Sequence, residues 1–145
     1  MGNFGFFLLY LCIGFLEKKM KTLPNTNSNK AIVQKFIDET KTRISKGVDI
    51  TFTGKAQSEL LDLNLLYDIT VDDIEDAILN LTTENYYRGI DPSPKSDFDV
   101  CAFYANIGAD HVGIYFKYGL EVDGLQILIF SNHVPKFPMN QPFKN

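Results

Sequence analysis

The carboxyl-terminal part of this chain contains three apolar runs with the length and composition of β-strands, at residues 98–105, 112–118 and 125–130. Short turn-forming stretches separate these runs, and one stretch contains Asp123-Gly124, a pair that favours tight hairpin turns. Consecutive strands joined by short turns pair antiparallel, so the runs predict a β-meander. Helical patterns come first along the chain, and this order is typical of the α+β class.

The first helical pattern begins near Ala31, where apolar residues recur close to one stripe. Ser28 or Asn29 is a candidate N-cap, and Gly47 is the expected end of the helix. Residues 48–53 then alternate between polar and apolar side chains, which predicts a short strand.

Two further helices are expected before the meander. Residues 55–65 form a brief helical pattern, and a second pattern starts at Thr70. Thr70 and Asp73 have the spacing of a capping arrangement, in which acidic side chains also complement the positive end of the helix dipole. The Tyr86-Tyr87-Arg88 stretch is expected on a loop after this helix.

The amino-terminal segment differs in composition from the rest of the chain. Residues 4–16 are almost wholly apolar, but they are fewer than the roughly 20 residues that a membrane helix needs. Lys18-Lys19 comes after this stretch, whereas a signal peptide carries its basic residues in front. We expect residues 1–29 to lie outside a single domain at residues 30–145, with translation starting at Met20 and a cytoplasmic location. A short membrane anchor is the alternative.

Composition narrows the candidate chemistry. The formal net charge of −4 is opposite to the basic balance that drives nonspecific nucleic-acid binding. Cys12 and Cys101 lack metal-ligand spacing, and Cys101 lies in an apolar run where a buried free thiol is expected. His111 and His133 are the only histidines, so a metal site built from several histidines is excluded.

The middle strand of the meander has two different faces. Alternation places Ile114, Phe116 and Tyr118 on one face, which is expected to join the core, and Tyr115 and Lys117 on the other. A tyrosine and a lysine side by side on an open sheet face suit an aromatic platform for a base and a cation for a phosphate. A solvated lysine beside a half-buried tyrosine is the plainer interpretation.

Arg88 and His133 are further candidates. An arginine flanked by tyrosines can bind a phosphate with two hydrogen bonds, although one tyrosine could instead fill the core while Arg88 pairs with a carboxylate. His133 follows an apolar run that is expected to break at Ser131-Asn132-His133, and three prolines are expected to carry the tail away from there. Imidazole suits proton transfer near neutral pH, but a lone histidine is more often structural.

Four stretches, in order, carry a resemblance to a known family: VDITFTGKAQSELLDLNL, LTTENYYRGI, VGIYFKY and ILIFSNHVPKFPMNQPF. Together they resemble the MqsR-type toxins of bacterial type II toxin–antitoxin systems, over about residues 30–143. The resemblance implies a RelE-like α+β fold, with helices packed on a twisted antiparallel sheet. It also implies cleavage of mRNA, with or without the ribosome and without a metal or other cofactor, and silencing by a cognate antitoxin.

The family's functional residues fall on Arg88, Tyr115 and His133, and a typical strand lysine falls on Lys117. The resemblance therefore implies catalytic roles for the first three, with Lys117, Arg88 and Tyr87 binding phosphate or RNA. The residue types suit the reaction, which needs a base for the 2′-hydroxyl, cations for the phosphate and an acid for the 5′-oxygen. The acidic balance of the chain and the lack of tryptophan depart from the family. The alternative is a non-catalytic protein-interaction module of the same fold.

Overall fold

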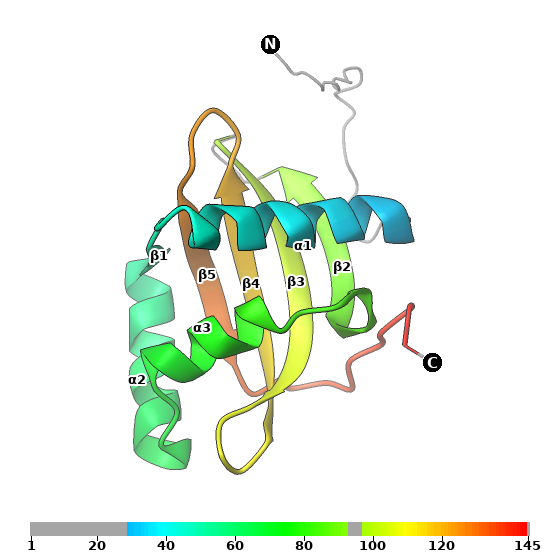
Figure 1. Ribbon diagram of the computed structural model, residues 1–145. Helices are drawn as coiled ribbons and strands as arrows, with labels where there is room; N and C mark the ends of the chain where they lie inside the picture. Colours follow the sequence, from blue (N-terminus) through cyan, green and yellow to red (C-terminus); the bar gives the residue numbers. More distant parts are fainter. Residues whose placement is uncertain (1–28, 93–96, 145) are drawn as a thin grey trace.

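The computed structural model describes residues 29–92 and 97–144. The expected start at Met20 and the apolar stretch at residues 4–16 lie outside the described residues. Along the chain the elements are α1 (Lys30–Ser45), β1 (Ile50–Phe52), α2 (Gly54–Tyr67), α3 (Val71–Leu79), the 3-10 turn η1 (Thr83–Asn85), β2 (Tyr86–Pro92), β3 (Phe98–Ile107), β4 (Val112–Glu121) and β5 (Ile127–His133) (Figure 1). In the described part of the chain, no helix has the length and apolar character needed to cross a membrane.

The predicted α+β class is confirmed, but the expectation of a purely antiparallel sheet is wrong. The sheet has five strands in the order β1-β5-β4-β3-β2, and β1 pairs parallel with β5. Strands β3, β4 and β5 form the predicted antiparallel meander, and β2 adds a fourth antiparallel strand that was not predicted. The parallel pair arises because α1 crosses the sheet near the end where β5 begins, so β1 enters beside β5 from that same end (Figure 1).

Two sequence expectations about strand limits are also wrong. Tyr86, Tyr87 and Arg88 belong to the edge strand β2 rather than to a loop. The last strand does not break at Ser131, because β5 continues through His133. Both extensions depend on pairing with a neighbouring strand, which supplies backbone partners to residues without a strand-like pattern.

Helix ends follow the caps that the sequence indicated. Asn29 is the N-cap of α1, and its side chain accepts a hydrogen bond from the Ile32 amide. Thr70 and Asp73 form the predicted capping box at the start of α3. Gly47 follows α1 with a positive φ of 90°, a conformation that glycine adopts without steric cost.

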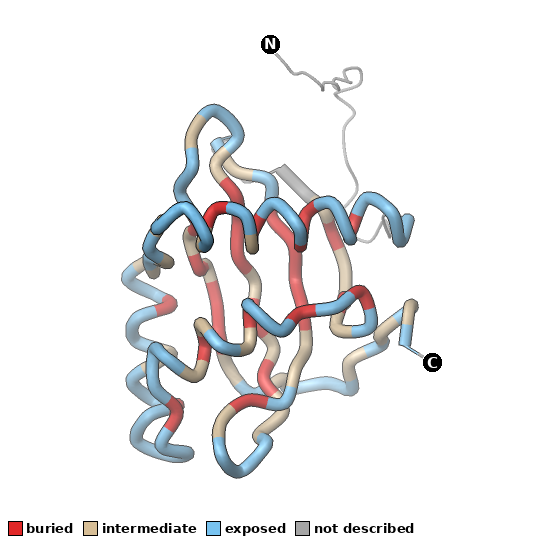
Figure 2. The backbone as a smooth tube through the Cα atoms, viewed as in Figure 1, coloured by how far each residue is buried: buried red, intermediate tan, exposed pale blue. Residues whose placement is uncertain are grey.

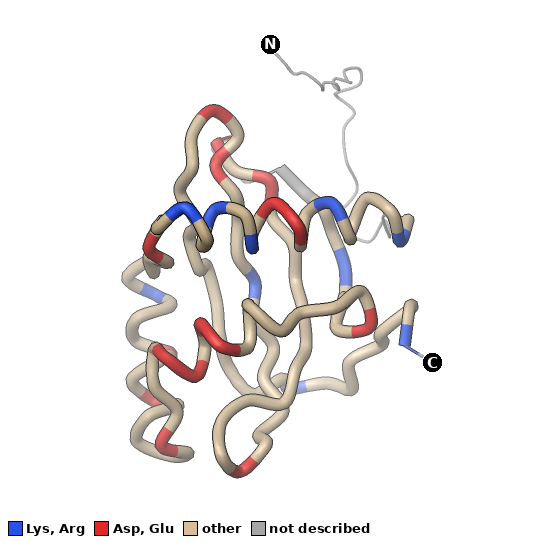
Figure 3. Tube along the Cα trace, in the orientation of Figure 1, with Lys and Arg blue, Asp and Glu red and all other residues tan. Residues whose placement is uncertain are grey.

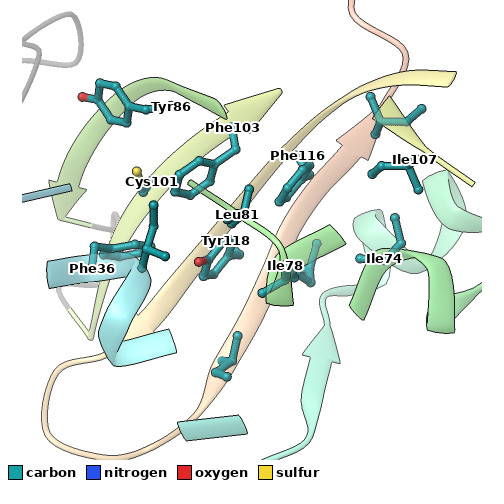
Figure 4. Packing of buried hydrophobic residues seen from close by; sticks show 14 of the residues in the cluster. Phe36, Ile74, Ile78, Leu81, Tyr86, Cys101, Phe103, Ile107, Phe116 and Tyr118 are labelled. Atoms are coloured by element: carbon teal, nitrogen blue, oxygen red, sulfur yellow. The ribbon is translucent and has the colours of Figure 1, made fainter. Parts of the chain in front are cut away.

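The core lies between the sheet and the two helices α1 and α3, which cross the same face (Figure 1; buried segments in Figure 2). Its aromatic centre joins Phe36 of α1 with Phe103, Phe116 and Tyr118 (Figure 4). The Tyr118 hydroxyl donates to Thr40 Oγ1 at 2.8 Å, since the Thr40 hydroxyl itself donates to the Phe36 carbonyl. Burial raises the pKa of Tyr118 well above its ordinary value, so the phenol stays neutral.

Helix α2 does not lie on this face but runs alongside β5, below the short strand β1 (Figure 1). Glu59 Oε1 accepts hydrogen bonds from the Asn132 amide at 3.0 Å and the Ser131 hydroxyl at 3.1 Å. Asn132 Nδ2 donates to the Ala56 carbonyl at 3.1 Å. The polar pair Ser131-Asn132 therefore docks a helix against the part of β5 that extends past β1.

Candidate functional site

The candidate site lies on the face of the sheet opposite α1 and α3, here called the outer face. The predicted division of β4 is confirmed: Ile114, Phe116 and Tyr118 are fully buried, whereas Tyr115 and Lys117 are partly exposed on the other side. Strand pairing extends this alternation across the neighbouring strands. The outer face therefore collects residues from β2, β3, β4 and β5.

Two rows of residues cross the outer face at right angles to the strands. In the first, Arg88, Ala102, Lys117 and Ser131 stand opposite one another on successive strands from β2 to β5. In the second, here called the ring row, Tyr104 pairs with Tyr115 and Tyr115 pairs with His133. The topology thus places two cations in one row and three rings in the row beside it.

The imidazole of His133 lies against the ring of Tyr115, with the centroids 5.0 Å apart and the planes inclined by 32°. His133 Nδ1 lies 3.0 Å from the carbonyl oxygen of Val134. A carbonyl only accepts hydrogen bonds, so Nδ1 carries the proton and Nε2 of the neutral ring bears the lone pair. Nε2 is therefore the atom that can take a proton from a ligand.

A bulge in β2 separates two neighbouring tyrosines. The register shifts between Tyr86 and Arg88, so Tyr86 enters the core while Tyr87 joins the outer face. The Tyr87 ring meets Tyr115 edge-on at 6.1 Å, and Arg88 Cζ lies 5.8 Å from the centre of the Tyr87 ring. One tyrosine is thus a core residue, as the sequence allowed, and the other connects Arg88 to the ring row.

All five predicted site residues lie on this one face, and all five are partly exposed: Tyr87, Arg88, Tyr115, Lys117 and His133. Tyr104 was not among them, although it occupies the ring row beside Tyr115. Its ring lies over Gly113, where an added Cβ would collide with the phenol. Strand alternation in residues 98–105 was the signal that could have found it.

A polar cluster where α2 meets β5 was not predicted from the sequence. Lys55 Nζ donates to Glu59 Oε2 at 2.9 Å and to the Ser131 hydroxyl at 3.0 Å. Burial raises the pKa of Glu59, but the hydrogen bonds from Lys55, Asn132 and Ser131 outweigh burial, and the pKa is lowered overall. Glu59 is therefore an anion at neutral pH, held beside one end of the first row.

The carboxyl-terminal tail, which was expected to run clear of the site, stays packed against the domain. It returns along the end of the sheet to η1 and β2, where Phe143 stacks on Tyr86 with the ring centroids 5.3 Å apart (Figure 1). Gln141 Nε2 donates to the Glu84 carbonyl at 2.9 Å. Packing against a buried tyrosine, which the sequence pattern did not reveal, holds the tail there.

The acidic helix on the covered face and the cations of the outer face come from different elements. Helix α3, on the covered face, carries Asp72, Asp73, Glu75 and Asp76, whereas strands β2 and β4 carry Arg88 and Lys117 (Figure 3). A hollow of about 340 Å³ lies beside α3, lined partly by Asp73 and Asp76, and none of the five predicted site residues lines it. Within the described residues no group of three or more His, Cys, Asp or Glu side chains is placed to hold a metal ion.

Comparison of the chain with protein-family models, with curated proteins and with solved structures found no match.

Proposed function

We propose that this protein is a metal-free endoribonuclease toxin of the MqsR type, with a RelE-like arrangement of helices and sheet. The observation that carries the proposal is the contact between His133 and Tyr115, with Arg88 and Lys117 on the same face. One ring has a nitrogen that can take a proton, the other has a hydroxyl that can give one, and the two cations suit a phosphate. Metal-free RNA cleavage uses these three kinds of group.

In the proposed reaction His133 Nε2 takes the proton of a ribose 2′-hydroxyl. The 2′-oxygen attacks the adjacent phosphorus, a new P–O bond forms and the bond to the 5′-oxygen breaks. Tyr115 gives its hydroxyl proton to the departing 5′-oxygen, so the products are a 2′,3′-cyclic phosphate and a 5′-hydroxyl. Arg88 and Lys117 neutralise the charge that develops on the phosphate, and Tyr87 holds Arg88 and stacks on a base.

The same proposal includes the partners that the resemblance implies. The substrate is mRNA, free or on the ribosome, and the protein acts in the cytoplasm until a cognate antitoxin covers the outer face. The net charge of −4 does not oppose this, because Arg88 and Lys117 place two positive side chains on the outer face itself. Local charge at the site governs ligand binding more than the total does.

The test is cleavage of a mixed-sequence RNA by the purified full chain in the presence of a chelator, with and without ribosomes. His133→Ala and Arg88→Ala should each abolish cleavage while the circular dichroism spectrum stays unchanged. Lys35→Ala is the matched control, since Lys35 is an exposed lysine on α1. Cleavage that survives in His133→Ala, or its absence in wild type under both conditions, would refute the proposal.

A second candidate function is a non-catalytic interaction module. It is favoured by the exposed leucines at the end of α2, because Leu61, Leu65 and Leu66 are 58%, 73% and 72% exposed. Apolar groups gathered on one surface are typical of protein contacts. If the wild-type chain cuts no RNA, substitution of these leucines by lysine and measurement of partner binding becomes the next experiment.

A further inference from the structure

Lys55 comes from a different part of the chain than the predicted site residues, yet it reaches the first row of the outer face. Its ammonium is 3.0 Å from the hydroxyl of Ser131, and Ser131 stands opposite Lys117 in the sheet. The side chain of Lys55 is 66% exposed. Lys55 therefore extends the line that begins at Arg88 on β2 and passes through Lys117 on β4.

Strand spacing fixes the distances along this line. Neighbouring strands lie about 4.8 Å apart. Arg88 and Lys117 are two strands apart, so their backbones are separated by about 10 Å across the sheet. Ser131 follows one strand further on, and Lys55 lies at its hydroxyl. The three positive side chains thus lie in a line from the β2 edge to α2. The length of this line suits several successive phosphates of a nucleic-acid backbone.

The ring row runs parallel to this line of cations. Tyr104, Tyr115 and His133 lie two residue pairs nearer the end of the sheet and cross β3, β4 and β5. A single nucleic-acid strand is bound by just such a combination, in which cations follow the backbone and rings stack with the bases. The two rows then set the direction in which the nucleic-acid strand crosses the sheet.

We infer that Lys55 is a third phosphate-binding residue, and that bound RNA crosses the outer face at right angles to the β-strands, from β2 to α2, with its backbone over Arg88, Lys117 and Lys55. The inference rests on the proposed function for the identity of the ligand, but it concerns binding and not cleavage. The bases lie over the ring row, so the scissile phosphate is the one nearest Lys117, beside Tyr115 and His133.

Glu59 holds Lys55 in this position and also reduces the positive charge that Lys55 offers to a phosphate. Its carboxylate accepts from Lys55 at 2.9 Å, so it orients the ammonium toward Ser131 while reducing the local positive charge. Exchange for glutamine keeps an oxygen that accepts from the Asn132 amide and removes the negative charge. Glu59→Gln is therefore expected to bind RNA more tightly, whereas a purely structural role for the cluster predicts equal or weaker binding.

The experiment measures binding of a fluorescent 2′-O-methyl RNA of about 10 nucleotides, which cannot be cleaved, by the full-length chain at several salt concentrations. Lys55→Ala should raise the Kd about threefold to tenfold and reduce the slope of log K against log salt by about 0.7, the value for one lost phosphate contact on a single strand. Lys55→Arg should retain the wild-type slope. Lys35→Ala on α1 is the matched control and should behave as wild type.

The outcomes separate this inference from the proposed function. A weaker Kd and a smaller slope for Lys55→Ala support the RNA path even if the wild-type chain cleaves nothing. If Arg88→Ala weakens binding while Lys55→Ala matches Lys35→Ala, the path is overturned and the ribonuclease proposal stands. Absence of RNA binding by wild type overturns the path outright.

Discussion

His133 and Tyr115 face each other across two neighbouring strands, with 5.0 Å between the centres of their rings. They are 18 positions apart in the sequence. The antiparallel pairing of β4 with β5 is what brings them into register. Any slip of one residue in that pairing would turn one of the two rings to the opposite face of the sheet.

The first prediction concerns the hydroxyl of Tyr115. Tyr115→Phe keeps the ring that contacts His133 and Tyr87 but removes the proposed proton donor. RNA binding should stay near the wild-type value, while the cleavage rate should fall by about 10²-fold to 10⁴-fold, the usual contribution of a general acid. Anisotropy and single-turnover cleavage measure the two quantities separately. A fully active Tyr115→Phe chain would limit Tyr115 to stacking.

The second prediction concerns Glu59, which satisfies the Asn132 amide and the Ser131 hydroxyl. Glu59→Ala leaves these groups without that acceptor and should lower the free energy of unfolding by about 1–3 kcal/mol. Asp62→Ala on the exposed side of the same helix is the control and should change it by less than about 0.5 kcal/mol. Urea unfolding at pH 7 measures both, and equal effects would contradict the docking role of Glu59.

A pH dependence follows from the same carboxylate. Its pKa in the folded protein is below the ordinary value of 4.5, because hydrogen bonds outweigh burial. The charged form thus stabilises the fold above about pH 4.5, and this stabilisation is lost as the pH falls through the lower folded-state pKa. The stability difference between wild type and Glu59→Gln should therefore shrink as unfolding is followed from pH 6 to pH 3. A difference that is constant with pH would show that the charge contributes nothing.

The third prediction uses Gly113, whose missing Cβ leaves room for the Tyr104 ring. Gly113→Ala should push this ring aside and weaken RNA binding. The free energy of unfolding should change by no more than about 1 kcal/mol, because alanine is favoured over glycine within a strand. Gly54→Ala is the matched control, since nothing lies within 4 Å of an added Cβ there. Unchanged RNA affinity in Gly113→Ala would remove Tyr104 from the ring row.

The fourth prediction concerns the tail. Phe143→Ala removes the ring stacked on Tyr86 and should lower the free energy of unfolding by about 1–2 kcal/mol. Phe137 lies in the same tail but is 74% exposed, so Phe137→Ala should be almost neutral. Thermal unfolding of the two variants makes the comparison. Equal melting temperatures would show that the tail adds nothing to stability.

Patterns within short stretches of the sequence predicted the faces of the middle strand and the ends of helices. Alternation in β4 assigned Ile114 and Phe116 to the core and Tyr115 to the other face, and side-chain chemistry located the cap at Thr70. The faces of a strand and the cap of a helix each depend on residues that are only a few positions apart in the chain. Strand β2 was missed because its bulge places Tyr87 and Arg88 on one face and so interrupts the alternation.

Sequence patterns did not predict the contacts between distant parts of the chain. Lys55 and Glu59 are four positions apart on a helix, a spacing that predicts only an ordinary exposed ion pair. Their link to Ser131 exists because the parallel pairing of β1 with β5 sets α2 beside the last strand. Nothing in either stretch records that pairing, so the third cation of the outer face became visible only with the fold.

The placement of α2 has a consequence for association between copies of the chain. The outer edge of a strand offers unsatisfied amides that can recruit a foreign strand, and this is how sheets grow into ordered aggregates. Beyond β1 this edge of β5 is occupied by a helix, and the Asn132 amide is already taken by the carboxylate of Glu59. Growth of the sheet at that position is therefore blocked, and protonation of a single side chain is a route by which acid would reopen it.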